Sequence, residues 1–319
     1  MTALATTNQT AATLTISDQA RGYAEKSRSE ATKRAYRSDM AAWVAYCDQA
    51  GVSAALPATP GTVADYAASM GGQVAVSTIR RRLVTLSQAH KVAGLESPVS
   101  SEIVRTVLKG IIRDHGTAQR KAAPIRATNI RAFVTGTTGE DLGTLRDRAL
   151  VLLGFFGAFR RSELAALDMA DVTFSSEGVT ITLRRSKTDQ EGKGRTIGIC
   201  HQARPDACPV RALQAWIQAA QITEGPIFRK VTKSGKVASE ALTGAGVAFI
   251  LKAQAAALGL DADTISGHSL RRGFVTEAYA ADIPTPEIQA VTGHRSLQVL
   301  SGYYAEANVF RNATARVQL

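Results

Sequence analysis

Cysteine is scarce in this chain, and its spacing does not favour a metal site. The three cysteines, Cys47, Cys200 and Cys208, are an odd number and form no C-x-x-C pair. Such a set supports neither a disulfide framework nor a thiolate zinc site. His201 lies next to Cys200, and we interpret it as core packing in preference to a metal ligand. We therefore expect no bound metal and a reducing, cytoplasmic compartment.

Long hydrophobic runs are also missing. The longest nearly unbroken apolar stretch, residues 149–159, is well short of the ~20 residues that span a bilayer. The N-terminal sequence MTALATTNQT has neither the basic region nor the apolar stretch of a secretion signal. We expect a soluble protein that is neither secreted nor bound to a membrane.

The chain does contain an excess of positive charge on an ordinary globular composition. Its 319 residues include 38 lysines and arginines against 27 aspartates and glutamates, and 45% of the residues are hydrophobic. That hydrophobic fraction can bury the core of one large or two ordinary domains, and it excludes a disordered or fibrous chain. The formal net charge of +11 indicates a polyanionic partner, and nucleic acid is the commonest polyanion in a cytoplasm.

Sequence patterns divide the chain into four parts. We interpret residues 1–16 as a flexible tail, 17–117 as a bundle of four or five helices, 118–127 as a linker and 128–319 as a larger second domain. The linker AQRKAAPIRA combines basic residues and a proline with no apolar periodicity. Basic residues outnumber acidic ones on both sides of it, so both domains are expected to contact the polyanion.

Helix signals dominate the first domain. Apolar residues recur at helical spacing over 36–47, and Gly51 is placed to end that helix. A later helix is expected to begin at a Ser77 cap and to bury a stripe that runs from Ile79 to His90. Its opposite face is expected to be polar, basic and exposed. That face comprises Arg81, Thr85, Gln88 and Lys91.

The second domain changes its periodicity partway. Helical segments are expected near 128–135 and 144–168, and helices resume after residue 209 with a break over 223–240. Between them lie DVTFSSEG, VTITLRRSK and GRTIGI, short β-branched stretches separated by turn residues, which predict a three-stranded antiparallel meander. The expected fold class is therefore mainly α, with one small three-stranded sheet in the second domain.

Four islands in the second domain carry charged and reactive side chains: GAFRRSELAAL (157–167), RRSKTDQEGKGR (184–195), HSLRRGFVTEA (268–278) and TGHRSLQVLSGYY (292–304). Each alone has an ordinary explanation, such as a solvated helix face. In this order they resemble the tyrosine site-specific recombinases, the family of phage integrases, Xer proteins and Cre. The family pattern falls on Arg160, Lys187, His268, Arg271, His294 and Tyr303, with Glu163 in support.

The resemblance extends to the first domain. The segments RAYRSDMAAWVAYC, LPATPGTVADY and STIRRRL are similar to the helical, SAM-like core-binding domain of Cre-like enzymes. The layout then implied is that of Cre or Xer, a core-binding domain followed by a catalytic domain.

The resemblance also implies an activity. The chain would cut and rejoin duplex DNA at a specific inverted-repeat site through a 3′-phosphotyrosyl intermediate and a Holliday junction, as in the movement of a mobile element or the resolution of dimers. It would be a monomer or dimer in solution and a homotetramer on two synapsed sites, with or without an accessory protein. Because the adduct stores the bond energy, no cofactor, metal or ATP is expected.

The chemistry of these residue types supports the assignment independently. Arginine is permanently charged and matches phosphate oxygens in a bidentate manner, which suits Arg160 and Arg271 for stabilising a pentacoordinate phosphorus. A tyrosine hydroxyl has a reference pKa of ~10, so Tyr303 needs nearby positive charge and a proton acceptor such as His268. The departing 5′ oxygen needs a proton, and Lys187 on a hairpin is the candidate acid.

The position of the nucleophile depends on helix geometry. Tyr303 follows His294 by nine residues, which is about 900° on one unbroken helix and half a turn out of phase. We therefore expect a break at Ser301 and Gly302. The adjacent Tyr304 is the rival nucleophile, and the family spacing favours Tyr303.

Further basic residues are candidates for DNA contact, although a solvated face is the alternative for each. Arg161 cannot share a helix face with Arg160, and the segment 242–259 opens with Gly and Ala, so base contacts of relatives cannot be carried over to it. The predicted DNA-binding residues are Arg34, Arg37, Arg81, Lys91, Arg120, Lys121 and Arg161.

Two other functions stay open at this point. One is a catalytically silent DNA-binding regulator with the same fold, although every catalytic position is filled. The other is a type IB topoisomerase, which shares the chemistry without exchanging strands, although the Cre-like layout argues against it.

The expected role of Lys187 gives a first test. Lys187→Ala should cleave ordinary DNA slowly, because the departing oxygen lacks its proton donor. Replacing that oxygen by sulfur, a leaving group that needs no proton, should restore most of the rate in single-turnover assays. Equal impairment on both substrates would instead assign Lys187 to phosphate binding.

Overall fold

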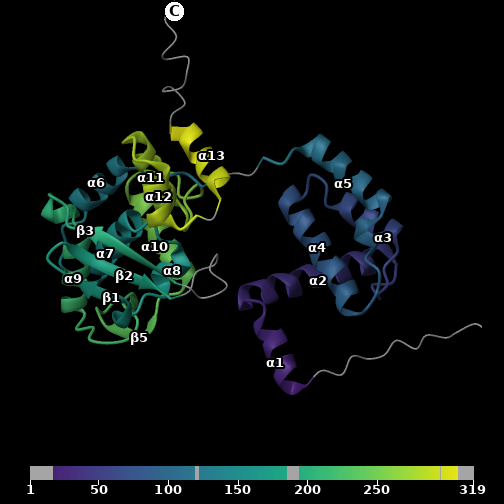
Figure 1. Cartoon of the computed structure of the whole chain (residues 1–319), viewed down its shortest axis with the longest axis horizontal. Helices are drawn as coiled ribbons and strands as arrows, with labels where there is room; N and C mark the ends of the chain where they lie inside the picture. Colours follow the sequence, from purple (N-terminus) through teal and green to yellow (C-terminus); the bar gives the residue numbers. More distant parts are fainter. Residues whose placement is uncertain (1–16, 119–121, 185–193, 295, 308–319) are drawn as a thin grey trace, which may run out of the picture. The chain divides into compact units, whose positions relative to one another are not determined.

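The structure, a computed structural model, describes residues 17–118, 122–184, 194–294 and 296–307 (Figure 1). The expected tail 1–16 and three candidate residues, Arg120, Lys121 and Lys187, lie outside the described residues. The chain divides into two compact units, one up to Arg120 and one from Lys121. Within the described ranges, no helix has the length and apolar character needed to cross a membrane.

The first unit is the predicted helical bundle. It consists of α1 (Asp18–Lys26), α2 (Glu30–Ala50), α3 (Pro60–Ser69), α4 (Val76–Val92), a single 3-10 turn (Pro98–Ser100) and α5 (Glu102–His115). Gly51 ends α2 with a φ of 68°, as expected. The core forms around Trp43 and Cys47 of α2, which are buried. The predicted inward stripe of α4 is also buried, and it consists of Ile79, Leu83, Leu86 and His90.

The predicted exposed face of α4 needs a correction. The helix begins at Val76 after Ala75, so Ser77 is not its cap. Thr85 is only 2% exposed, and its hydroxyl donates to the buried carboxylate of Asp39 at 2.9 Å. Arg81 contacts the same carboxylate at 2.8 Å. A buried carboxylate requires donors, and α4 supplies them to Asp39 of the neighbouring helix α2, a demand that the pattern of α4 alone does not show.

The second unit is mostly helical and contains two small sheets. The elements before and within the first sheet are α6 (Ala127–Gly136), α7 (Leu142–Phe156), α8 (Arg161–Ala165), a 3-10 turn (Met169–Asp171), β1 (Val172–Phe174), β2 (Gly178–Leu183) and β3 (Arg195–Cys200). After the sheet come a 3-10 turn (Pro205–Ala207), α9 (Pro209–Ala219), β4 (Arg229–Val231), β5 (Val237–Ala241), α10 (Gly244–Ala257), α11 (Ser269–Ala280), α12 (Thr285–Thr292) and α13 (Leu297–Ala307).

The sheets confirm one expectation and add a feature. Strands β1, β2 and β3 pair antiparallel in chain order, which is the predicted meander. The segment 223–240, expected as a break between helices, contributes to a second antiparallel pair, β4 with β5. These two strands, RKV and VASEA, are short, so their sequence carries little strand periodicity.

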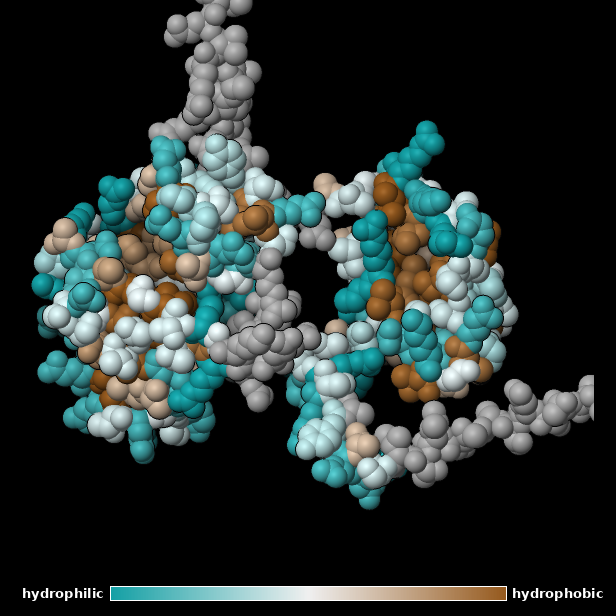
Figure 2. Space-filling model, in the orientation of Figure 1, coloured by the Kyte–Doolittle hydropathy of each residue, from teal (hydrophilic) through white to brown (hydrophobic). Residues whose placement is uncertain are grey.

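Helix α7 forms the centre of the second unit. Every side chain from Ala149 to Phe155 is buried, so the longest apolar run of the sequence is a core helix that is covered on several sides. It contacts α9 and α11 as well as α6 and α8. Figure 2 shows that hydrophilic residues cover much of the visible surface of both units.

The predicted linker 118–127 is partly integrated into the second unit. The backbone N–H of Ala123 donates to Thr264 at 2.8 Å, and that of Ile125 donates to Ser269 at 3.0 Å. Ile125 is 7% exposed and belongs to the core of the second unit. Gly273 of α11 lies against this segment, and a Cβ atom at Gly273 would be 1.8 Å from the Ile125 carbonyl oxygen.

Gly273→Ala should therefore destabilise the second unit. The nearest atoms, the carbonyl oxygen and carbon of Ile125, belong to the backbone. The segment around Ile125 would therefore have to move away from α11, at a cost of about 2–3 kcal/mol or more. Chemical denaturation measures the loss. Gly198→Ala is the matched control, because nothing lies within 4 Å of a Cβ atom there; similar stability of the two variants would contradict the close approach.

Candidate active site

The connection between α7 and α8 leads to Arg160, the first of the predicted catalytic residues. Ala158 is fully buried and has a φ of 48°, a left-handed conformation that strains a non-glycine residue by about 1–2 kcal/mol. Its carbonyl accepts a hydrogen bond from Arg271 Nη1 at 2.9 Å. Arg160 follows as the N-terminal cap residue of α8. The strained turn thus brings the backbone before Arg160 to the guanidinium of Arg271.

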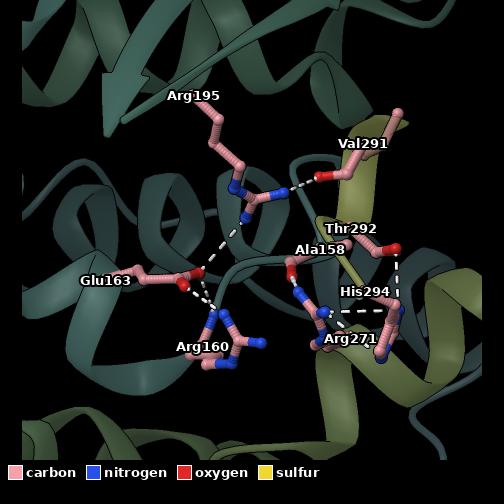
Figure 3. A network of polar contacts seen from close by, with 8 residues as sticks. All are labelled: Ala158, Arg160, Glu163, Arg195, Arg271, Val291, Thr292 and His294. Carbon is pink, nitrogen blue, oxygen red and sulfur yellow. Dashed lines mark hydrogen bonds and ion pairs between the residues drawn. The ribbon is translucent and has the colours of Figure 1, made fainter. Parts of the chain in front are cut away.

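Glu163 links two arginines (Figure 3). Glu163 is only 4% exposed. Its carboxylate accepts one hydrogen bond from Arg160 Nη1 at 2.5 Å and another from the Arg160 backbone N–H at 2.9 Å. Arg195 Nη2 approaches the same carboxylate at 3.4 Å, and Arg195 Nη1 donates to the Val291 carbonyl. The supporting role predicted for Glu163 thus has a structural basis, since it fixes Arg160 relative to β3.

The second half of the network comes from α11 and from the turn after α12 (Figure 3). Arg271 Nη2 lies 3.2 Å from His294 Nε2 and 3.3 Å from Nδ1. His294 Nδ1 is also 2.8 Å from Thr292 Oγ1, and Gln289 donates to the His294 carbonyl at 2.7 Å. Arg271 is 3% exposed, so its position is fixed by packing and by these contacts.

Mutual repulsion and burial shape the charges of this cluster. Burial lowers the pKa of Arg271 to about 10, and the charge of Arg160 adds to the effect. Burial likewise lowers the pKa of His294 to about 4, with the nearby arginines adding to it. The pKa of Arg195 is lowered by burial while Glu163 opposes the shift. At neutral pH the arginines are therefore charged and His294 is neutral.

Tyr303 belongs to this cluster and Tyr304 does not. The Tyr303 ring centroid is 6.2 Å from that of His294, and the Arg272 guanidinium lies over the Tyr303 ring at 5.4 Å. Tyr304 is 54% exposed and packs edge-to-face on Tyr279 at 5.3 Å. Adjacent residues on a helix point in different directions, and the structure directs Tyr303 to the arginines.

The predicted helix break at Ser301 and Gly302 is wrong. Helix α13 runs without interruption from Leu297 to Ala307, and the Ser301 hydroxyl donates within the helix to Gln298 at 2.8 Å. The chain instead turns at Gly293, whose φ is 63°. A side chain would also collide there, since a Cβ atom would lie 2.9 Å from Arg195 Nη1. The turn precedes His294, so His294 and Tyr303 do not share one helix.

The remaining described candidates differ in exposure and position. His268 is exposed at the start of α11, and Arg161 is exposed at the start of α8. In the first unit Arg34, Arg37 and Lys91 are exposed, while Arg81 is paired with Asp39.

No cluster of metal-binding side chains accompanies them. Among the described residues, no group of three or more His, Cys, Asp or Glu could hold a metal ion. His201, interpreted from the sequence as core packing, is instead exposed, and its Nδ1 lies 3.7 Å from Sγ of the buried Cys208.

Sequence reasoning missed three residues of this site. Arg195 opens β3 at the end of the lysine-bearing island, Arg272 directly follows Arg271, and Thr292 directly precedes the Gly293 turn. Arg195 could have been noticed in the sequence, because it is the last residue of the lysine-bearing island and a cation at the start of a predicted strand. No local pattern indicates its contact with Glu163, which lies 32 positions away in the chain.

Comparison with known proteins identifies the class. The phage integrase family matches residues 125–309, and the SAM-like N-terminal domain of phage integrases matches residues 23–96. The chain belongs to the phage integrase family, which confirms the resemblance read from the four islands.

Individual relatives cover most of the chain. An integrase/recombinase XerD homolog of Selenomonas ruminantium is 37% identical over 300 residues, which are 93% of this chain and 88% of the relative. Recombinase Cre of Escherichia phage P1 is 24% identical over 314 residues, 91% of this chain and 88% of Cre.

Solved structures share the fold. A XerH site-specific recombinase bound to palindromic difH substrate gives a TM-score of 0.62 at 18% identity, covering 84% of this chain and 75% of that one. A lambda integrase dimer bound to a COC' core site gives 0.59 at 17% identity, covering 89% and 74%. The predicted mainly helical fold with its SAM-like first domain is thereby confirmed.

The depressed pKa of His294 predicts a stability change in acid. An unfolded histidine takes up its proton near pH 6.5, whereas His294 in the folded chain does so only near its pKa of about 4. Protons therefore bind the unfolded state first, and stability falls as the pH drops from 6.5 towards 4. Because His294 is partly exposed, we expect a loss of about 1–2 kcal/mol at pH 5 from this group.

Urea denaturation at pH 7 and pH 5 measures this loss. His294→Gln cannot take up the proton, so its stability should fall less between the two values. If the wild type and His294→Gln lose the same stability, His294 does not carry the proton linkage.

Proposed function

We propose that this chain is a site-specific DNA recombinase that cleaves and rejoins duplex DNA with Tyr303 as nucleophile. One observation carries the proposal: a cluster of buried or half-buried guanidinium groups lies beside Tyr303. Arg160 and Arg195 share the Glu163 carboxylate, and Arg271 contacts His294, whose ring lies next to that of Tyr303. Such a surplus of positive charge is unfavourable without an anionic ligand. A DNA phosphate supplies that ligand.

The charges fit the reaction. With His294 neutral, the guanidinium groups of the cluster outnumber the single carboxylate of Glu163, so the described part of the site carries a surplus of positive charge. Attack of a phenolate on a phosphodiester gives a doubly negative, pentacoordinate transition state, so the surplus stabilises the transition state more than the singly charged ground state. Two of the guanidiniums are already oriented by Glu163 and by the Ala158 carbonyl, which lowers the reorganisation needed on binding.

The Tyr303 oxygen forms a bond to phosphorus while the bond from phosphorus to the 5′ oxygen breaks. The phenol proton goes to His268, and the leaving oxygen takes a proton from Lys187, as the family pattern implies. The product is a 3′-phosphotyrosyl adduct with a free 5′ hydroxyl. That hydroxyl attacks the phosphorus of a second adduct, the bond from this phosphorus to the tyrosine oxygen breaks, and the released phenolate takes up a proton as the strand is resealed. Since one phosphodiester replaces another, neither ATP nor a metal is required.

Exchange between two duplexes requires four strand cleavages, and each chain carries one Tyr303. We therefore propose a tetramer on two inverted-repeat sites, with a Holliday junction between the two rounds of exchange. Two solved structures support an assembly on a repeated site. The XerH structure contains a palindromic substrate, and the lambda integrase structure is a dimer on a core site. The exposed Arg34, Arg37 and Lys91 of the first unit are proposed to contact the DNA of each half-site.

A covalent-adduct assay tests the proposal. The purified chain is incubated with DNA from its own genetic neighbourhood and run on a denaturing gel. Wild type and Tyr304→Phe should form a protein–DNA band, because Tyr304 lies outside the arginine cluster. Tyr303→Phe should form none, a loss of at least about 10³-fold.

Sequencing the trapped ends then gives the cleavage site. An adduct that persists in Tyr303→Phe would overturn the choice of nucleophile. Tight DNA binding with no adduct in any version would favour a catalytically silent DNA-binding protein.

A further inference from the structure

Arg161 is the cation of the first island that the active site does not use. Arg160, Arg195 and Arg271 each bond a carboxylate or a backbone carbonyl. Arg161, directly beside Arg160, is exposed, and within the described ranges no hydrogen bond or ion pair joins its guanidinium to another residue. An ordinary surface arginine would also be conformationally free, since its long side chain has many rotamers.

The Arg161 side chain is held, however, by two glycines from different elements. A Cβ atom at Gly267 would lie 2.4 Å from Arg161 Cδ and 2.8 Å from both Cβ and Cγ. A Cβ atom at Gly244 would lie 3.6 Å from Arg161 Cγ and 3.8 Å from Nε. The aliphatic part of Arg161 therefore rests in a space that exists only because residue 267 has no side chain.

Backbone conformation does not explain the glycine at 267. The φ of Gly267 lies outside the left-handed range that favours glycine, and the residue is buried. An alanine would be acceptable there on conformational grounds and would stabilise the loop by restricting the unfolded chain. The space for Arg161 is the remaining reason for glycine, which means that the local structure fixes the position of an exposed cation.

The place of this cation is at the rim of the active site. Arg161 is the residue after Arg160, Gly267 is the residue before His268, and Gly244 is the first residue of α10. Helices α8 and α10 are in contact. The Arg161 side chain thus lies where three chain segments meet beside the cluster.

We propose that Arg161 binds the DNA phosphate adjacent to the scissile one on the cleaved strand and so positions the scissile phosphate among the three buried arginines. This rests on the proposed function above. Phosphates on one strand follow at about 3.4 Å of helix rise, and side chains of two consecutive residues on different faces reach points several ångströms apart. Arg160 and Arg161 can therefore contact two consecutive phosphates. Because packing against Gly244 and Gly267 already restrains the Arg161 side chain, its guanidinium loses little conformational entropy on binding.

The first test measures salt-dependent binding to a duplex of about 30 base pairs from the chain's own neighbourhood. One lost phosphate contact should lower the slope of log K against log salt by about 0.9. Arg161→Gln is expected to show this change. Arg204→Gln removes the same charge from an exposed arginine that is already paired with Asp206 at 2.6 Å, so its slope should stay at the wild-type value.

The second test locates the phosphate on the mapped cleavage site. Uncharged methylphosphonate replaces each phosphate in turn within three positions of the scissile one. At an adjacent position on the cleaved strand the replacement should weaken wild-type binding about 10-fold and Arg161→Gln binding less than about 2-fold. Arg161→Lys should keep the sensitivity to charge at that position but cleave more slowly, because an ammonium group lacks the planar fork.

The outcomes separate the two proposals. The role of Arg161 would be overturned if the salt slope of Arg161→Gln equalled that of the wild type. It would also be overturned if Arg161→Gln kept the full wild-type sensitivity to methylphosphonate at every position next to the scissile phosphate. In either case, adduct formation by the wild type would still support the recombinase. A wild type that forms no adduct would overturn the proposed function, and the salt slope would still decide whether Arg161 contacts a phosphate.

Discussion

The carboxylate of Glu163 holds the cationic centre of this protein together. It is nearly inaccessible to solvent, and it bonds Arg160 on its own helix turn and Arg195 at the start of β3. Three arginines within one cluster repel one another, and a single buried anion offsets part of that repulsion without neutralising it. The charge that remains is the property on which phosphate chemistry depends, and burial, with the nearby arginines adding to it, keeps His294 neutral.

The fold was predictable where it follows a repeating pattern. The apolar stripe from Ile79 to His90 and the alternating strands before and after residue 184 have the helical and strand periods that burial imposes. The order of the four islands predicted a site at Arg160, Arg271, His294 and Tyr303, and the structure brings these residues close together. Such islands fix residue identity, because the chemistry of phosphate cleavage limits the choice of side chain.

The errors share a physical cause. Thr85 is buried because Asp39 of another helix needs donors, and the turn before Tyr303 lies at Gly293 because Arg195 occupies the space of a side chain there. Ser301 and Gly302 have weak helix propensity, yet Leu300, fully buried against α11, holds their helix in place. In each case a contact between distant segments outweighs the local preference, and no single window of sequence contains that contact.

The chain segment before α6 affects how such proteins can be divided. Because Ala123 and Ile125 bond to Thr264 and Ser269, the strip is structurally a part of the catalytic unit although its composition is that of a connector. A chimera that exchanges DNA-recognition domains between relatives must therefore join upstream of Ala123. A junction placed at residue 128, where the helical pattern begins, would remove Ile125 from the core and leave a hydrophobic slot beside the helix that carries Arg271.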